Sequence, residues 1–189
     1  MRLLTHILAL VTLLITSGAT AYAQYVMEWA QTFGGNGWDE ANTCIETRDG
    51  DYMIAGFAKL EQKNLWIVKM HNDGRGRWGK VLDEYFSSAA NSMIQDSDSN
   101  IVVVGHATRK REYQSNLLLM KIDTTGNILW QKTYGGDGDE EGHAIIECKD
   151  GGYAIAGMTI SLYYATVLYY IVIHCTSKNR KTGNIITKN

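Results

Sequence analysis

The sequence is poor in cysteine and has no excess of positive charge. Three cysteines occur among 189 residues, at Cys44, Cys148 and Cys175, and no two of them form a Cys-x-x-Cys pair. A disulfide-stapled scaffold needs more cysteines in a shorter chain, so we expect small core residues with one bridge at most. The formal net charge of −2 argues against nucleic acid or another polyanion as the partner.

Motifs that carry catalysis or hold a cofactor are also missing. The chain has no Gly-x-Ser-x-Gly and no Ser-x-x-Lys. The glycine-rich segment 34–37 lacks the lysine and the strand-to-helix setting of a phosphate-binding loop. No pair of histidines has the spacing of a transition-metal site. We therefore predict a protein that is not an enzyme and has no cofactor.

Two acidic segments are candidates for calcium sites. Asp137, Asp139 and Glu140 lie in a glycine-containing loop, and carboxylate oxygens are ligands that Ca²⁺ prefers, so these residues are weak candidates. A solvated acidic loop is the commoner outcome of such a pattern, and we predict no metal site. Residues 96–100 begin like an EF-hand loop, but Ile101 stands where the loop requires glycine. We predict a hairpin turn there.

The N-terminus has the three parts of a secretory signal peptide. Arg2 supplies a positive charge, residues 3–15 are apolar, and Ala21-Tyr22-Ala23 fits the small-x-small rule for cleavage. We predict that residues 1–23 are removed and that Gln24 begins the mature protein. The protein is then secreted, periplasmic or on the cell surface.

The mature chain repeats itself. Residues 29–35 read WAQTFGG and residues 130–136 read WQKTYGG, with a middle copy that has lost the Gly-Gly pair. Successive copies are offset by 49 and 52 positions, which predicts repeats at 24–77, 78–129 and 130–189, the last degenerate after residue 158. The repeated positions that define the copies are Trp29, Trp78, Trp130, Gly56, Gly105 and Gly157.

Each copy has the local chemistry of β-structure. Short runs rich in Ile, Val, Tyr and Trp alternate with Asp-Gly, Gly-Gly and Asn-rich turns, a pattern typical of antiparallel strands. The four strands expected in the first copy lie around Trp29 and over residues 41–46, 52–58 and 64–71. The fold class predicted is all-β, with about three four-stranded antiparallel blade repeats forming a partial or truncated β-propeller. We expect the repeated tryptophans between blades, and a close backbone approach or bulge at the repeated glycines.

These repeats resemble those of secreted bacterial β-propeller proteins over roughly residues 27–160. The resemblance is carried by Trp-x-x-Thr-[Phe/Tyr]-Gly-Gly, then by Asp-Gly-[Asp/Gly]-Tyr-x-Ile-Ala-Gly. The Asp-x-x-Gly-x-x-x-Trp piece is also similar to Asp-box and quinoprotein-type blades. The resemblance implies a propeller-like architecture but leaves the activity open, because proteins with such folds have many different functions.

The last part of the chain departs from the pattern. Residues 158–175 contain no Asp, Glu, Lys or Arg, a length that also suits a membrane helix. The Thr, Tyr and β-branched content and the place in the repeat favour strands instead, so a membrane contact is not expected. Three blades leave open edges, and the alternatives are a fragment of a longer array, an open stack, or self-association of two chains into a ring.

The function predicted is an exported, non-enzymatic scaffold that binds a protein or a glycan. Its variable surface would consist of the loops after Gly34-Gly35 and Gly135-Gly136 and the excursion 108–115, because binding usually lies on loops held by a rigid frame. The basic residues 109–111 in that excursion are interpreted as a solvated loop. The alternatives are a fragment of a propeller enzyme, quinoprotein or sialidase-like, and a membrane-tethered surface protein.

Overall fold

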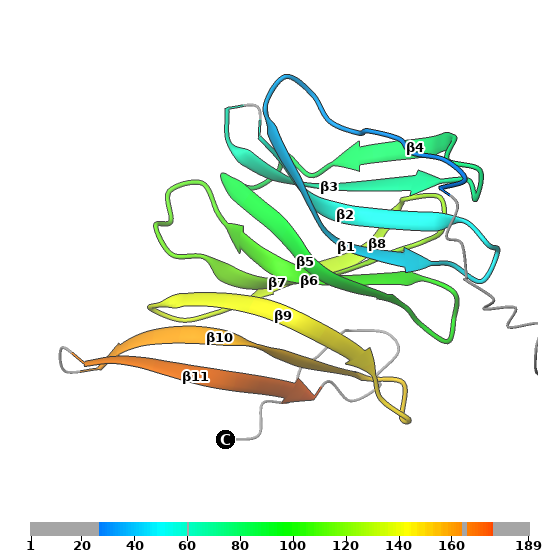
Figure 1. Ribbon diagram of the computed structural model, residues 1–189. Coiled ribbons are helices and arrows are strands. Elements are labelled where there is room, and N and C mark those ends of the chain that lie inside the picture. The colour runs from blue at the N-terminus through cyan, green and yellow to red at the C-terminus, as the bar shows by residue number, and fades with distance from the viewer. Residues whose placement is uncertain (1–26, 60, 164–165, 176–189) are drawn as a thin grey trace, which may run out of the picture. The chain divides into compact units, whose positions relative to one another are not determined.

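The computed structural model describes residues 27–59, 61–163 and 166–175, and all regular elements in these residues are β-strands (Figure 1). The strands are β1 (Trp38–Glu46), β2 (Tyr52–Lys59), β3 (Lys63–Met70), β4 (Gly76–Val81), β5 (Ser87–Gln95), β6 (Ile101–Thr108), β7 (Asn116–Ile122), β8 (Ile128–Tyr134), β9 (Asp139–Glu147), β10 (Tyr153–Tyr163) and β11 (Thr166–Cys175). Residues 31–175 belong to one compact unit, and residues 27–30 belong to a separate N-terminal one.

The strands form three sheets in chain order. The first sheet has the order β1-β2-β3-β4, the second β5-β6-β7-β8, and the third joins β9, β10 and β11 with β10 in the middle. All neighbouring strands are antiparallel. We call these sheets blade 1, blade 2 and blade 3. Four-stranded antiparallel sheets of this kind are the blades of propellers, so the predicted all-β fold class is confirmed.

The sequence repeat is reproduced strand by strand. Residue 38 begins β1, and β5 and β9 begin 49 and 101 positions later. The same offset of 49 separates β2 (52–59) from β6 (101–108) along their whole length. Because the strand bounds keep the offsets of the sequence, equivalent residues in the three blades have equivalent places in their sheets.

Sheets and sequence repeats differ in phase. Trp78 and Trp130 open the second and third repeats, but they lie in β4 and β8, the last strands of blades 1 and 2. A blade therefore takes three strands from one repeat and its outer strand from the next. The repeat boundaries stay a prediction about the sequence, because a repeat and a sheet need not begin at the same residue.

The strand predicted around Trp29 is not formed. Residues 27–37 have no strand, and Trp29 is 38% exposed. The equivalent strands β4 and β8 each pair with the strand before them, β3 and β7. Among the described residues, β1 is the first strand in the chain.

Two apolar clusters fill the spaces between the blades. The first joins blades 1 and 2 and includes Ile67, Val103 and Leu118; the second joins blades 2 and 3 and includes Val104 and Ile155. The first strand of each following blade lies against the preceding one, since β5 contacts β1, β2 and β3, and β9 contacts β5, β6 and β7. Each sheet thus buries its faces against its neighbours, which a single layer cannot do alone.

Two of the repeated tryptophans, Trp78 and Trp130, lie at these junctions. Trp78 of blade 1 packs against the first cluster, and its Nε1 donates a hydrogen bond to the carbonyl oxygen of Thr124 in blade 2, at 3.3 Å. Trp130 of blade 2 packs against the second cluster, with its ring centroid 6.5 Å from that of Tyr153 in blade 3. Cys44, expected in the core, is exposed.

The uncharged run at residues 158–175 is built as β10 and β11, except for residues 164–165, which lie outside the described residues. Ten residue pairs join the two strands, from Ala154 with Cys175 to Tyr163 with Thr166. The interpretation of this run as strands is therefore confirmed. In the described part of the chain, no helix has the length and apolar character needed to cross a membrane.

The repeated glycines lie beneath equivalent bulges. In each blade the first strand has one extra residue opposite the second strand, at Asn42, Asn91 and His143. Gly105 in β6 faces this bulge, and a Cβ atom placed on it would run into the carbonyl oxygen of Ala89. Gly56 and Gly157 meet the carbonyl oxygens of Glu40 and Glu141 in the same way. The backbone approach that the sequence suggested is therefore present in all three blades.

A methyl group at this position is expected to destabilise the protein. For Gly105→Ala we expect a loss of about 1–3 kcal/mol in the free energy of unfolding, because the clash is with backbone and can be relieved only by moving a strand. Chemical denaturation at equilibrium measures the loss.

Gly136→Ala is the matched control. Nothing lies within 4 Å of a Cβ atom built at Gly136, so we expect a change within about 0.5 kcal/mol. Equal stability of the Gly105→Ala and Gly136→Ala variants would contradict the tight approach under the bulge.

Candidate functional site

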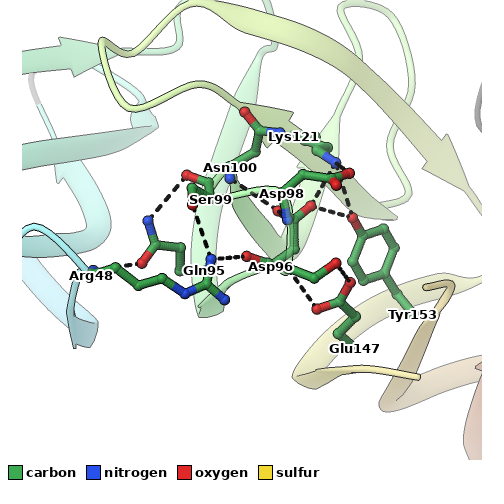
Figure 2. A network of polar contacts seen from close by, with 10 residues as sticks. Arg48, Gln95, Asp96, Asp98, Ser99, Asn100, Lys121, Glu147 and Tyr153 are labelled. Carbon is green, nitrogen blue, oxygen red and sulfur yellow. Dashed lines mark hydrogen bonds and ion pairs between the residues drawn. The ribbon is translucent and has the colours of Figure 1, made fainter. Parts of the chain in front are cut away.

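A buried polar network lies at the turn between β5 and β6 (Figure 2). At its centre is Asp96, which is 1% exposed. Its Oδ2 receives Lys121 Nζ from β7 at 2.6 Å and the hydroxyl of Tyr153 from β10 at 2.8 Å. Its Oδ1 accepts the backbone N–H groups of Asp98 and Asn100, each at 3.0 Å. The predicted hairpin turn is therefore confirmed, and its first residue also joins blade 2 to blade 3.

The environment shifts two ionisation equilibria in this network. Burial alone would raise the pKa of Asp96, but the hydrogen bonds from Lys121, Tyr153 and the Asn100 N–H outweigh it and hold that pKa below its ordinary value of 3.8. Burial, then the hydrogen bond to the Asp96 carboxylate, raises the pKa of the Tyr153 phenol far above its ordinary value. Both shifts favour an ionised Asp96 beside a neutral Tyr153.

The same lysine position is used in blade 1. Lys69 corresponds to Lys121, is 4% exposed, and pairs with Asp49 at 2.7 Å and Asp51 at 3.1 Å in the turn before β2. The hydrogen bond from Lys69 is the main reason that the pKa of Asp49 falls to about 2. Because the arrangement recurs from blade to blade and satisfies its charges internally, we assign it to holding the turns.

Two of the acidic residues considered for calcium accept hydrogen bonds from within the protein. Asp139 Oδ1 accepts the N–H of Ser115 at 2.7 Å, while Glu140 accepts the N–H of Gly136 at 3.0 Å and the hydroxyl of Thr159 at 2.9 Å. Within the described residues no group of three or more His, Cys, Asp or Glu side chains could hold a metal ion. The calcium candidates Asp137, Asp139 and Glu140 are thus not brought together.

The Gly-Gly loops are held by a neighbouring carboxylate. Asp39 Oδ2 accepts the N–H of Gly35 at 2.5 Å, just as Glu140 accepts that of Gly136, its equivalent. In the middle copy this acidic position is Ser88, whose hydroxyl accepts the N–H of Leu65 at 2.9 Å instead. Loss of the Gly-Gly pair in the middle copy therefore goes together with loss of its acidic partner.

The eroded middle copy borders a cleft between the loops of blades 1 and 2. The cleft has a volume of about 420 Å³, within the range of small-ligand sites. It is lined by Glu61, Gln62, Asn64, Asp83, Tyr85, Phe86 and Lys110. These residues come from the β2–β3 loop, the start of β3, the segment between β4 and β5, and the β6–β7 loop.

Two aromatic side chains form the apolar part of this cleft. Tyr85 is half-buried and packs against the cluster between blades 1 and 2, and burial raises the pKa of its phenol. Phe86 is 48% exposed. The equivalent positions in the first copy are Asn36 and Gly37, small loop residues. The aromatic pair therefore belongs to the middle copy alone.

The polar part of the cleft includes an unsatisfied acceptor. The Oδ1 atom of Asn64, at the start of β3, is buried and has no hydrogen-bond partner. A buried acceptor of this kind costs free energy unless something donates to it. Glu61 and Asp83 supply carboxylates at the rim, and Lys110 supplies an ammonium group. The cleft thus offers acceptors and a donor around an aromatic surface.

The predicted variable surface contributes to this cleft in part. Lys110 belongs to the excursion 108–115, but the loops after Gly34-Gly35 and Gly135-Gly136 do not line it. Of the basic residues 109–111, Arg109 donates to the hydroxyl of Thr133 at 2.7 Å and so is partly used within blade 2. The aromatic pair was not predicted as a site; its signal in the sequence was the break in the repeat at positions 85–86.

The chain has a distant structural resemblance to a known protein. No protein-family model and no curated protein sequence matches the chain. A solved structure of the periplasmic gluconolactonase from Pseudomonas aeruginosa is similar at 9% sequence identity and a TM-score of 0.26. The match covers 74% of this chain and 66% of that protein, just under two thirds of its length. Similarity at this level assigns neither a reaction nor a substrate to this chain.

Removing the Tyr153 hydroxyl is expected to weaken the junction of blades 2 and 3. For Tyr153→Phe we expect a loss of about 1.5–3 kcal/mol in the free energy of unfolding, because a buried carboxylate loses a donor. Tyr113→Phe is the control, since Tyr113 is 96% exposed. The two variants are compared by chemical denaturation, and an unchanged stability of Tyr153→Phe would show that the contact contributes nothing.

The Asp96 network also predicts a dependence on pH. A carboxyl whose pKa is lower in the folded state than in the unfolded state stabilises the fold above its unfolded pKa. That contribution is lost as the pH falls below 3.8 and through the lower folded value. We expect wild type to exceed Asp96→Asn in stability at about pH 7 and the difference to shrink toward about pH 3, measured by denaturation across this series. A difference that grew on acidification would contradict the sign.

Proposed function

We propose that this chain is an exported, non-enzymatic scaffold that binds a glycan in the cleft between the loops of blades 1 and 2. The observation that carries the proposal is the buried, unpaired Oδ1 atom of Asn64 beside the aromatic pair Tyr85 and Phe86. A ligand that donates a hydrogen bond next to an apolar face would satisfy both features at once.

A sugar ring has this combination of groups. Its hydroxyl groups donate and accept hydrogen bonds, and its C–H faces pack on aromatic rings, which carry a large apolar surface. Asn64 would accept from one hydroxyl, the carboxylates of Glu61 and Asp83 from others, and Lys110 would donate. Hydrogen bonds to charged groups are among the stronger ones, so this rim would orient a ring that the aromatic pair holds.

The surroundings of the cleft suit binding by a largely preformed site. Tyr85 packs against the cluster between blades 1 and 2, and the N–H of Phe86 donates to the carbonyl oxygen of Thr108 at 2.8 Å. The backbone that carries the aromatic pair is thus tied to β6. Preformed sites lose less conformational entropy on binding than mobile loops do.

The proposed export depends on the N-terminus. The predicted signal peptide, residues 1–23, lies outside the described residues, so its support is the sequence pattern alone. An exported glycan-binding protein would meet its ligand outside the cytoplasm, where polysaccharides of cell surfaces occur. Mass spectrometry of the protein recovered from a secreting host would show whether the chain begins at Gln24.

The proposal predicts a role for Phe86 in binding. The mature protein is screened against a panel of neutral, N-acetylated and acidic oligosaccharides, and the best binder is titrated by calorimetry. For Phe86→Ala we expect the affinity to fall about tenfold, because a stacked ring supplies much of the contact. The saccharide should be recovered chemically unchanged, as expected for binding without turnover.

Tyr113→Ala serves as the control for this variant. Tyr113 is an aromatic residue that is 96% exposed and does not line the cleft. We expect it to leave the affinity unchanged. If no saccharide in the panel binds, or if Phe86→Ala and Tyr113→Ala lose the same affinity, the cleft does not bind a glycan as proposed.

A further inference from the structure

Equivalent asparagines connect successive blades. At the bulge of blade 1, Asn42 Nδ2 donates to the carbonyl oxygen of Ala90 in blade 2 at 2.9 Å. At the bulge of blade 2, Asn91 Nδ2 donates to the carbonyl oxygen of Gly142 in blade 3 at 3.0 Å. In each case the acceptor is the residue before the bulge of the next blade. The position that would continue the series from blade 3 is His143, which is exposed.

The turns after the first strands form a second series of contacts. The N–H of Arg48 in blade 1 donates to Gln95 Oε1 of blade 2 at 2.8 Å. The N–H of Ser97, the position equivalent to Arg48, donates to Glu147 Oε2 of blade 3 at 2.7 Å. The donor that would continue this series is Lys149, and the equivalent acceptor on blade 1 is Glu46. Both residues are exposed.

Blade 3 exposes positions that are buried where a further blade follows. Ile45 and Ile94 pack against the cluster ahead of them, whereas their equivalent Ile146 is 63% exposed. Val102 and Val104 are 0% exposed in blade 2. Their equivalents in blade 3, residues 154 and 156, are alanines that are only half-buried. This side of blade 3, which we call the leading face, is thus open along the described strands β9 and β10.

Blade 1 exposes the complementary side. Met93 is 3% exposed where blade 2 meets blade 1, but its equivalent Cys44 is exposed. Ala90 is 0% exposed, whereas its equivalent Ala41 is exposed. A groove of about 290 Å³ is lined in part by Val81, which is 48% exposed, and by Trp66, which is 7% exposed. We call this side of blade 1 the trailing face.

We propose that the leading face of one copy docks on the trailing face of a second copy. The leading face of the second copy docks in turn on the trailing face of the first, so that two copies form a closed ring of blades. The contact would repeat the junctions already present within the chain. His143 would donate to the carbonyl oxygen of Ala41, the N–H of Lys149 would donate to Glu46, and Ile146 would be covered.

A second copy suits these two faces because they complement each other in both polarity and charge. Hydrogen-bond donors lie on the leading face and acceptors on the trailing face, an arrangement that forms head-to-tail contacts. Lys149 is basic and Glu46 is acidic, and the equivalent Arg48 already reaches the carbonyl oxygen of Asp96 across a junction at 2.6 Å. Two chains of three blades supply six, a number within the range found in closed propellers.

The mixing of two charge variants tests this arrangement. In Glu46→Lys two lysines would meet at each junction, and in Lys149→Glu two glutamates would meet. We expect each variant alone to dimerise about tenfold more weakly than wild type. In an equimolar mixture the mixed dimer pairs Lys with Glu at both junctions, so we expect it to be more stable than the dimer of either variant alone. Sedimentation equilibrium of the mature protein, each variant and the mixture measures the masses.

Ile146→Asp provides a second test that does not depend on these charges. It should reduce dimerisation at least tenfold, because an isoleucine expected in the contact becomes charged. Leu129→Asp is its control: Leu129 is 49% exposed on β8 and belongs to neither cluster. The proposal is overturned if wild type has the mass of a single chain, or if mixing the two charge variants restores no dimer. It is also overturned if Ile146→Asp and Leu129→Asp weaken dimerisation equally. Thermal melts establish that each variant is folded.

Discussion

The structure depends on the need of each sheet for apolar cover on both of its faces. Blade 2 shows this most clearly, because alternate residues of β6 point to different clusters: Val103 belongs to the one shared with blade 1, and Val104 to the one shared with blade 3. Burying such a side chain contributes roughly 1.5–3 kcal/mol, and a sheet with one neighbour would lose this on one face. Repetition is therefore what makes the blade stable, and the ends of an array are where that stabilisation is incomplete.

The bulges link this packing to the polar contacts between blades. A glycine in the second strand lets the first strand approach closely enough to bulge, as Gly105 does beneath Asn91. The bulged asparagine is then free of the strand pairing, and its amide reaches the next blade. One small residue in one strand thus permits a hydrogen bond made by another strand, and both recur at the same offsets. The glycines and the bulges therefore recur together as one structural feature of the repeat.

The sequence predicted those parts of the fold that depend on local chemistry. The offsets of the repeat, the hairpin turn at residues 96–100 and the strand character of 158–175 needed only composition and spacing. Which strand pairs with which is a non-local property. The sequence alone therefore did not show where each sheet begins or that no strand forms at Trp29. The cleft was not predicted for the same reason, since Asn64 and Phe86 come together only when two blades pack.

Departures from a repeat carry more functional information than its regular positions. A residue kept in every copy has a reason that every blade shares, as the lysines at 69 and 121 have in holding turns. A residue found in one copy cannot owe its presence to that shared reason. Tyr85 and Phe86 replace small loop residues in the middle copy alone, beside an acceptor that no described group satisfies. Tyr85 also packs against the cluster between blades 1 and 2, so it is the exposed ring of Phe86, at the cleft proposed for a glycan, that the packing of the blades does not account for.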